Sequence, residues 1–165
     1  MRWRNHQIIT GLAIYSITGG FISAGLAAVG AVLPDVLEVG GVIKHRTVTH
    51  WPYPYLLLAS ALYLWQWHNP SVLPYLLFFF VLGVVMHLLL DSLSNHGIPV
   101  GQSPSAGKRL SLNLYKTFTP SEEVTSAGLV VVFLATAYFR GLLSGEHIRL
   151  EVNLVVQLMG MLIGR

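Results

Sequence analysis

Residues 72–93 read VLPYLLFFFVLGVVMHLLLDSL, an apolar run in which His87 and Asp91 are the only acidic or basic side chains. A helix crosses a bilayer in about 20 residues, so this run is long enough to span one. A second apolar run, about residues 52–67, lies before it, and only a short turn at residues 69–71 separates the two. The pattern therefore predicts a helical hairpin in a membrane.

The composition of the whole chain also indicates a membrane protein. Of its 165 residues, 53% are hydrophobic and only 10% are charged, whereas soluble domains carry roughly 25% charged residues. These values exclude a disordered chain and argue against a soluble enzyme. At about 20 residues per crossing, the length allows about four to six membrane helices. We therefore expect an all-α integral membrane protein built from helical hairpins, with some helices short or re-entrant.

The chain contains no cysteine, so it has no disulfide, no thiolate nucleophile and no cysteine-type zinc site. Any bound metal must use His, Asp or Glu. The net charge of +3 is too small to indicate nucleic acid, which we do not expect as a partner. Membrane lipids are the expected surroundings.

The first apolar stretch, residues 8–33, has three interpretations. It forms two short helices, about 8–18 and 21–33, broken at Gly19-Gly20, or one long crossing, or a cleaved signal peptide, because two arginines precede it. The run is long for the core of a signal peptide, and the rest of the chain is equally apolar.

We expect one membrane domain over residues 1–165. Its parts are a half that carries the candidate site (1–100), a polar loop (94–122) and C-terminal helices (123–165).

The C-terminal part carries three local signals. Residues 110–118 alternate between apolar and polar, which favours a short extended piece. Residues 119–123, TPSEE, are typical of a helix start, and an apolar helix over 124–143 follows. Residues 150–164 mix apolar and polar side chains and suggest an interfacial helix or a partial re-entry.

The strongest chemical signal is the spacing of His87 and Asp91, which places both side chains on one helix face. A carboxylate costs ~2.5–3.5 kcal/mol at the bilayer centre, and less near a helix end. A metal ion offsets this cost, because it binds a neutral imidazole and an ionised carboxylate together. The alternative is a His–Asp hydrogen bond that ties helices together.

A bend at Gly19-Gly20 would bring further candidates to the same place. His6 and Asp35 would then emerge on one side of the membrane, where the hairpin of residues 52–93 also starts and ends. The side chains that would gather there are His6, Asp35, His45, His50, His87, Asp91 and His96. A straight first helix would instead put His6 a membrane thickness away, so a shared site predicts the bend.

The positive charges suggest an orientation. The site side would carry Arg2, Arg4, Lys44, Arg46, Lys108, Arg109 and Lys116, whereas the turns around Gly19 and Asn69 carry no Lys or Arg. Positive charges favour the cytoplasmic side of a membrane protein, so the site is predicted to face the cytoplasm.

These residues, in this order, resemble a family of small membrane-bound metal-dependent hydrolases of bacteria, which includes LexA-regulated inner-membrane proteins. The matching pieces are His6; Leu33-Pro34-Asp35; residues 45–50, HRTVTH; and His87 to Asp91 followed by Ser94, Gly97 and Pro99. The resemblance covers residues 6–100. The order of His and Asp is also distantly similar to that of zinc-dependent phospholipase C and related single-strand nucleases, which are helical and use several metals.

The chain departs from the family pattern in three ways. The family reads Leu-Pro-Asp-x-Asp-His, whereas this chain has Leu37 and Glu38 at the last two positions, so one possible ligand of a second metal is replaced. Ser94 stands where threonine is usual, and His96 is additional. A full multi-metal cluster and the substrate are therefore not carried over from the family.

The resemblance implies metal-assisted hydrolysis at the inner membrane. The candidate ligands are His6, Asp35, His50, His87 and Asp91. Mixed imidazole and carboxylate ligation favours zinc, and manganese or iron would also suit it. His45 or Glu38 would act as general base or extra ligand, and Arg46 would hold a phosphate.

We therefore expect a membrane-embedded hydrolase of phosphoester substrates, with lipids among the candidates. The alternative is a non-catalytic scaffold or assembly subunit, in which the same cluster is a structural metal site or a hydrogen-bonded staple. A transporter is less favoured, because its ionisable groups would lie on both sides of the bilayer centre.

Overall fold

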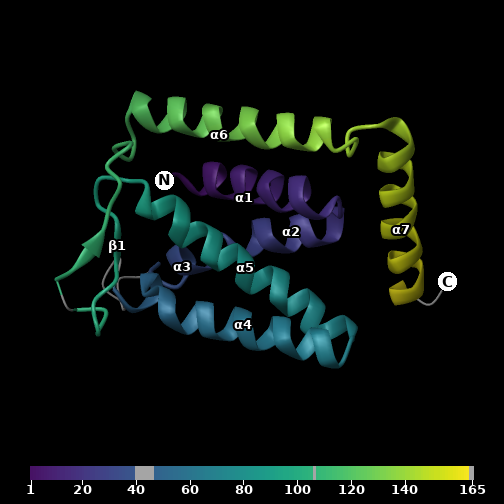
Figure 1. Ribbon diagram of the computed structural model, residues 1–165, viewed down its shortest axis with the longest axis horizontal. Coiled ribbons are helices and arrows are strands. Elements are labelled where there is room, and N and C mark those ends of the chain that lie inside the picture. The colour runs from purple at the N-terminus through teal and green to yellow at the C-terminus, as the bar shows by residue number, and fades with distance from the viewer. Residues whose placement is uncertain (40–46, 106, 164–165) are drawn as a thin grey trace.

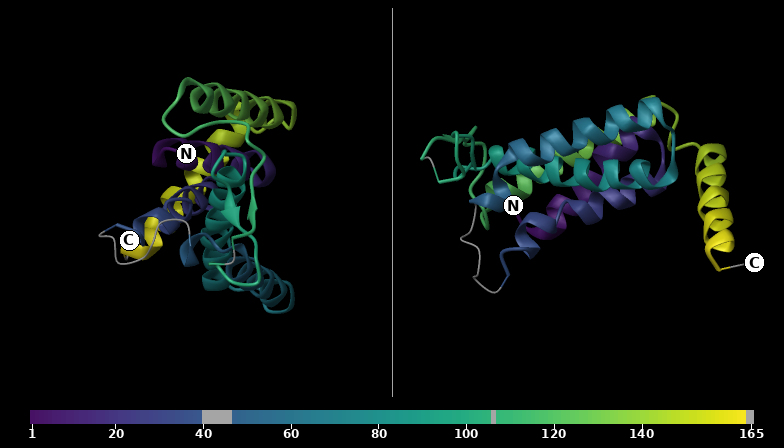
Figure 2. Two further views of the ribbon diagram at one scale, coloured as in Figure 1. Left: turned by 90° about the vertical axis from the view of Figure 1, so that its left-hand side faces the viewer. Right: turned by 90° about the horizontal axis from the view of Figure 1, so that it is seen from below.

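The computed structural model describes residues 1–39, 47–105 and 107–163. Its helical elements are α1 (Trp3–Thr18), α2 (Phe21–Gly30), α3 (Leu33–Val36), the 3₁₀ turn η1 (Val48–His50), α4 (Pro52–His68), α5 (Val72–Ser92), α6 (Pro120–Phe139) and α7 (Gly145–Ile163). A short antiparallel pair of strands, β1 (Ile98–Pro99) and β2 (Arg109–Leu110), lies between α5 and α6 in the chain. The longer helices from α1 to α6 run along the molecule, and α7 stands across one end (Figures 1 and 2).

The first apolar stretch is a bent hairpin, as the two-helix interpretation predicted. α1 ends at Thr18, and the next residue, Gly19, has a φ of 75°, a left-handed conformation that glycine adopts without a steric penalty. α2 then runs back along α1. The bend rules out a single straight crossing and brings the end of α2 back to the start of α1.

α2 and α5 approach each other backbone to backbone. A Cβ atom on Gly30 would lie 2.0 Å from the carbonyl oxygen of Phe80, and one on Gly83 would lie 2.1 Å from that of Ala27. Small residues allow helices in membranes to pack this closely. The contact fixes the segment that follows α2 against the helix that carries His87.

The hairpin predicted from residues 52–93 is confirmed as α4 and α5, which pack along each other. Among the described residues, only α5 and α6 are long and apolar enough to cross a membrane by length and composition. The predicted number of about four to six membrane helices therefore stays a prediction.

The predicted extended piece at 110–118 pairs with β1 at its start, and Tyr115 forms a single parallel bridge with Ser94. β2 ends at Leu110, and the chain beyond it runs against the end of α5. There the backbone N–H groups of Leu112 and Leu114 donate to the carbonyls of Ser92 and Leu93 (both 2.8 Å). The loop thus satisfies carbonyl groups that the end of a helix leaves open.

α6 begins at Pro120, as predicted, and α7 begins at Gly145, earlier than the predicted residue 150. Thr119 occupies the N-cap position, but its hydroxyl makes no cap hydrogen bond to α6.

α7 lies at the end of the molecule away from His6. His147 Nε2 lies 2.9 Å from the carbonyl oxygen of Gly19, and Glu151 Oε2 accepts the N–H of Phe21 at 3.0 Å. Arg140, just before α7, donates to the carbonyl of Ser16 at 2.5 Å. The positive charges are therefore not confined to the end that carries the candidate site, and the cytoplasmic orientation stays a prediction.

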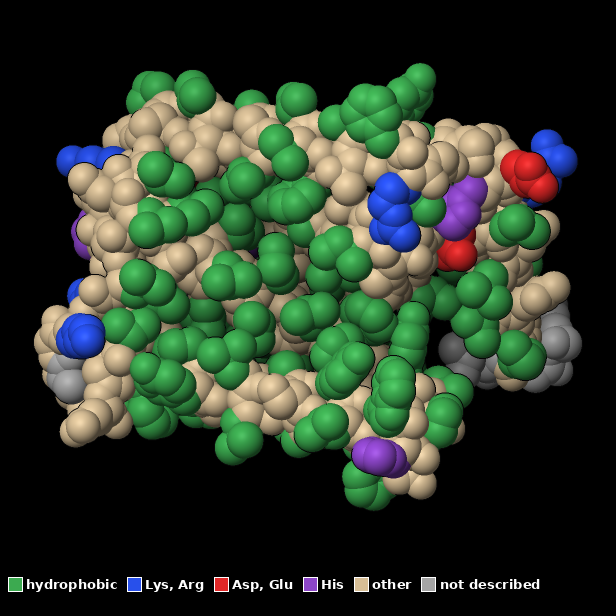
Figure 3. Space-filling model, viewed as in Figure 1, with side chains coloured by type: hydrophobic (Ala, Val, Ile, Leu, Met, Phe, Trp, Pro, Cys, Tyr) green, Lys and Arg blue, Asp and Glu red, His purple; other side chains and the backbone are tan. Residues whose placement is uncertain are grey.

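The surface carries many large apolar side chains. Leu57 on α4 and Val124 on α6 are each 73% exposed, and hydrophobic groups cover most of the face shown in Figure 3, with charged groups gathered toward its ends. A lipid environment would cover such a surface.

Candidate metal centre

The structure brings all five predicted ligand residues into one cluster, where α1 begins and α5 ends. His6 lies on α1, Asp35 on α3, His50 on η1, and His87 and Asp91 on α5. The three histidines are fully buried, Asp91 is 1% exposed, and the side chain of Asp35 is 13% exposed. Ligand atoms within 4.8 Å of one another form two groups in the described residues: His6, His87 and Asp91, and Asp35, His50 and His87.

Four ligand atoms from this set lie close together, with each carboxylate oxygen near both imidazole nitrogens. We call Asp35 Oδ1, His50 Nε2, His87 Nε2 and Asp91 Oδ2 the four-ligand cluster. The two nitrogens are 3.2 Å apart. Asp35 Oδ1 lies 3.5 Å from the nitrogen of His50 and 3.7 Å from that of His87. The corresponding distances from Asp91 Oδ2 are 3.5 and 3.8 Å.

These distances fit a shared metal ion better than direct hydrogen bonds. Most exceed the usual N–H···O range of roughly 2.7–3.2 Å. Two ligands bonded to one zinc ion at ~2.0–2.2 Å and a tetrahedral angle lie roughly 3.3–3.6 Å apart. A point equidistant from the cluster atoms of His50, His87 and Asp91 lies about 2.0 Å from each, the length of a zinc–nitrogen bond. These three atoms therefore fit a divalent ion without rearrangement, and Asp35 Oδ1 lies within 3.7 Å of both nitrogens.

In His50 and His87, the Nδ1 atom, which faces away from the four-ligand cluster, has a hydrogen-bond partner, as in known metal sites. His87 Nδ1 lies 2.6 Å from the carbonyl oxygen of Ala31. A carbonyl only accepts, so Nδ1 carries the hydrogen and Nε2 keeps its lone pair for the cluster. His50 Nδ1 lies 2.9 Å from Glu38 Oε1, and the hydroxyl of Thr49 donates to the same oxygen. Such partners orient metal-binding histidines.

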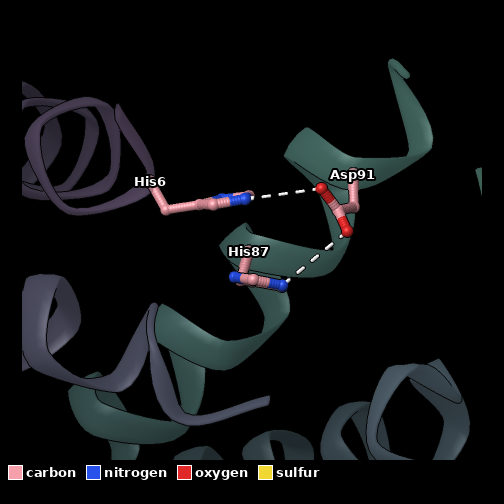
Figure 4. Close-up of side chains that lie close together, drawn as sticks. All are labelled: His6, His87 and Asp91. Atoms are coloured by element: carbon pink, nitrogen blue, oxygen red, sulfur yellow. Dashed lines mark ion pairs between the residues drawn. The ribbon is translucent and has the colours of Figure 1, made fainter. Parts of the chain in front are cut away.

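His6 approaches the other oxygen of Asp91. Its Nε2 lies 3.4 Å from Asp91 Oδ1, and its ring stacks on that of His87 with centroids 3.9 Å apart (Figure 4). The amino group of Met1 also donates to Oδ1, at 3.1 Å. Neither ring nitrogen of His6 has a hydrogen-bond partner within residues 1–39, 47–105 and 107–163.

His50 holds a proton in the protein without metal. Burial lowers the pKa of its imidazole, but the neighbouring carboxylates of Asp35, Asp91 and Glu38 raise that pKa to about 9. The carboxylates thus already attract a positive charge at the position where a metal ion would bind.

A cavity of about 490 Å³ adjoins the cluster. Its lining residues are Met1, Arg2, Trp3, Asp35, Glu38, Thr117 and Phe118. Asp35 therefore belongs to both the cluster and the cavity, so a small molecule in the cavity would reach the ligand atoms from the side of Asp35.

The structure describes only some of the other predicted site residues. His45 and Arg46 lie outside the described residues, as does Lys44. His96 is exposed, and its carbonyl oxygen accepts a hydrogen bond from Arg109 Nε at 2.8 Å. Glu38, predicted as a base or an extra ligand, lies on the Nδ1 side of His50, away from the Nε2 atom of the four-ligand cluster.

Sequence reasoning assigned Glu122 only to a helix start, but the structure gives it a larger role. It is fully buried and accepts hydrogen bonds from Arg2 N (2.6 Å), Asn5 Nδ2 (3.0 Å) and Phe118 N (2.8 Å). It thereby joins the two walls of the cavity, the N-terminal segment and the loop before α6. An acid in the first turn of an apolar helix was the signal available in the sequence.

The chain is also related to a known protein family. The sequence profile of the YdjM inner membrane protein family matches residues 1–161. The chain belongs to this family. No curated protein and no solved structure has significant similarity to it.

Membership of the YdjM inner membrane protein family confirms the prediction of a bacterial inner-membrane protein, and α5 and α6 are consistent with it. The name of the family states a location and no reaction. The buried His and Asp side chains are therefore the features of the chain that bear on its chemistry.

Proposed function

We propose that this YdjM-family protein is a membrane-embedded, metal-dependent hydrolase of phosphoesters. The observation that carries the proposal is the four-ligand cluster at the edge of a cavity, because its nitrogen–nitrogen and nitrogen–oxygen separations of 3.2–3.8 Å suit a divalent ion. Mixed nitrogen and oxygen ligation favours zinc, with manganese or iron as alternatives.

The residues of the chain divide the work between binding and orientation. Asp35, His50, His87 and Asp91 would hold the ion, while Glu38 and the Ala31 carbonyl keep the two imidazole rings in the binding tautomer. When bound, such an ion polarises a phosphoryl oxygen and brings the pKa of bound water near 7. Asp35 faces the cavity, so the substrate would approach from its side.

The position of the cluster supports the choice of substrate. It lies at one end of helices with lipid-compatible surfaces, where a phosphoester at the membrane surface would be in reach. Arg2 lines the cavity, where it would bind a phosphate, and Arg46 stays a prediction from the sequence because it lies outside the described residues. We place this end at the cytoplasmic face, because it carries the start of α1 and the segment between α5 and α6. These parts of the chain contain Arg2, Arg4, Lys108, Arg109 and Lys116.

The access to Asp35 favours catalysis over a purely structural ion. Structural zinc sites are closed, whereas catalytic sites keep an open coordination position. A side chain that is 13% exposed and lines a cavity of about 490 Å³ matches the catalytic type.

The proposal is tested on detergent-purified protein loaded with zinc or manganese. Chromogenic phosphomonoesters and phosphodiesters, and phospholipids in mixed micelles, serve as substrates. We expect metal-dependent hydrolysis that His87→Ala and Asp91→Asn abolish. The matched control is His68→Ala, an exposed histidine at the end of α4, which should hydrolyse like the unmodified protein.

Two results would overturn the proposal. Stoichiometric metal without hydrolysis of any substrate would assign the cluster to a structural role in a scaffold or assembly subunit. Protein that binds no divalent metal would exclude both the hydrolase and the structural metal site.

A further inference from the structure

A second cavity lies at the end of the molecule away from the four-ligand cluster. Its volume is about 590 Å³, within the range of roughly 300–1,000 Å³ that is typical of small-molecule sites. Its walls are the turn between α1 and α2, the turn between α4 and α5, and α7, which stands across this end (Figure 1). None of its lining residues belongs to the candidate metal centre, so a molecule bound here would be a separate ligand.

Three side-chain oxygen atoms converge beside Gly20 in the wall of this cavity. A Cβ atom built on Gly20 would have them as its nearest neighbours. They are Ser23 Oγ at 2.8 Å, Thr18 Oγ1 at 3.8 Å and Glu151 Oε2 at 3.9 Å, and we call them the three-oxygen site. All four residues line the cavity. Because glycine has no side chain, the space between the three oxygens is open to an atom of a ligand.

The three-oxygen site offers acceptors rather than donors. The hydroxyl of Thr18 donates to the carbonyl of Ile14, and that of Ser23 donates to the carbonyl of Gly20, both at 2.9 Å. The hydrogens of both hydroxyls are therefore used within the protein, whereas oxygen lone pairs remain. Glu151 Oε2 accepts the first backbone N–H of α2, and an ionised carboxylate has about four lone-pair positions, so it can accept further hydrogen bonds.

The charge at the cavity favours a cation. Glu151 is the only charged side chain among the described residues that line it. The start of α2 contributes the positive end of a helix dipole, roughly half a charge, which the full charge of the carboxylate exceeds. Arg140, just before α7, donates to the carbonyls of Ser16 and Ile17 instead. A primary ammonium group carries one positive charge and three N–H donors, which match the three acceptors.

The other side chains of the cavity are mostly apolar. Three helices supply them, among them Ile22 of α2, Leu76 of α5, and Leu154 and Leu158 of α7. Leu154 is also 44% exposed, so this wall continues into the apolar surface that lipid would cover. A soluble amine would leave these side chains in contact with water, whereas the acyl chain of a lipid would cover them.

We propose that this cavity binds a membrane phospholipid with a primary-amine headgroup. The ammonium nitrogen lies in the three-oxygen site and donates to its oxygens, and the start of an acyl chain lies against Leu154 and Leu158. Gln66 and Ser71, at the turn between α4 and α5, are uncharged side chains that can donate to the phosphate. No residue of the metal centre takes part, so the inference does not depend on the proposed function.

The test compares phospholipids that differ only in headgroup. Protein purified in detergent and freed of lipid is titrated with phosphatidylethanolamine, phosphatidylglycerol or phosphatidylcholine with identical acyl chains, and native mass spectrometry counts the lipids bound per chain. The first has a primary ammonium, the second has no cation, and the third has a cation without N–H donors. We expect one phosphatidylethanolamine to bind at least about 10-fold more tightly than either other lipid, because only its headgroup forms charge-assisted hydrogen bonds with Glu151.

Two variants locate this preference. Glu151→Gln removes the charge but keeps an acceptor for the first N–H of α2, and Gly20→Ala places a methyl group among the three oxygens. Each should weaken phosphatidylethanolamine binding by about 10-fold, to the level of the other lipids. The matched controls, which should keep the preference, are Glu146→Gln, an exposed acid in the first turn of α7, and Gly25→Ala, whose Cβ would meet nothing within 4 Å.

Three results would overturn the inference: equal affinity for the three lipids, a preference that Glu151→Gln or folded Gly20→Ala retains, or free ethanolamine competing as strongly as the lipid, which would assign the site to a soluble amine. If Gly20→Ala does not fold, Glu151→Gln decides the question alone. His87→Ala should keep the preference for phosphatidylethanolamine, so failure of the hydrolase proposal would leave this inference standing.

Discussion

Replacing Gly83 by alanine tests whether the contact between α2 and α5 sets the geometry of the metal centre. The new Cβ would lie 2.1 Å from the carbonyl oxygen of Ala27, and real Cβ atoms essentially never approach closer than 3.0 Å. The obstacle is the backbone of α2, which cannot rotate away as a side chain would. The two helices must therefore separate by at least about 0.9 Å.

This displacement acts on the centre, because its ligands come from both helices. Asp35 and the Ala31 carbonyl follow α2, whereas His87 lies one turn beyond Gly83 on α5. A shift of about 0.9 Å would stretch the His87–Ala31 contact from 2.6 to about 3.5 Å and the Asp35–His87 separation from 3.7 to about 4.6 Å. Two ligands at ~2.2 Å from one ion cannot be more than about 4.4 Å apart.

The expected loss of zinc affinity follows from two changes: the His87–Ala31 contact is stretched, and Asp35 moves out of reach of the ion. Removing the partner that orients a metal-binding histidine weakens metal affinity by about 10–100-fold. With Asp35 also out of reach, we expect Gly83→Ala to bind zinc at least about 100-fold more weakly than the unmodified protein. Overpacking should also destabilise the fold by about 1–3 kcal/mol, and each kcal/mol lowers the midpoint of thermal unfolding by roughly 2–4 °C.

Zinc affinity is measured by competition with a chromophoric chelator, and thermal unfolding by intrinsic fluorescence, both in detergent. Gly25→Ala is the matched control, because it lies on α2 and its Cβ would meet nothing within 4 Å. Alanine is favoured over glycine in a helix by about 1 kcal/mol, so the control should be as stable as the unmodified protein or more so. Gly83→Ala with unchanged affinity and unfolding midpoint would refute the reasoning.

Four further predictions follow from individual contacts. Glu38→Ala should weaken zinc affinity by about 10–100-fold, and Glu38→Gln, which keeps an acceptor for His50 Nδ1, should weaken it less. If chelator competition gave Glu38→Ala the same zinc affinity as the unmodified protein, the His50 ring would be held by other groups. Because the pKa of His50 is raised from 6.5 to about 9, zinc binding at neutral pH should release a proton, and affinity should rise about tenfold per pH unit up to about pH 9, as titrations in buffers of different ionisation enthalpy would detect. In the metal-free protein the same shift stabilises the fold fully below about pH 6.5, and this contribution is lost as the pH rises through about 9. Glu122→Ala leaves three N–H groups without their acceptor and should lower the unfolding midpoint clearly, whereas Glu123→Ala, whose side chain is 44% exposed, should change it little.

The sequence alone was sufficient where the signal is local. Apolar runs and turn residues predicted the hairpin of α4 and α5, and Gly19-Gly20 marked the bend between α1 and α2. The spacing of His87 and Asp91 placed both on one helix face, because helical periodicity depends only on neighbours in the chain. Together with the bend, this was enough to predict that His6 joins them.

Tertiary structure decided the features that depend on distant contacts. Glu122 meets Arg2 across a separation of 120 residues, and His87 bonds to the Ala31 carbonyl, a backbone group that every residue carries and no motif reveals. The division of Asp91 between His6 and His50 also depends on where three separate helical segments end in space. Residue types along the chain therefore determined which side chains can bind a metal, whereas the packing of α2 against α5 determined which atom of each faces the ion.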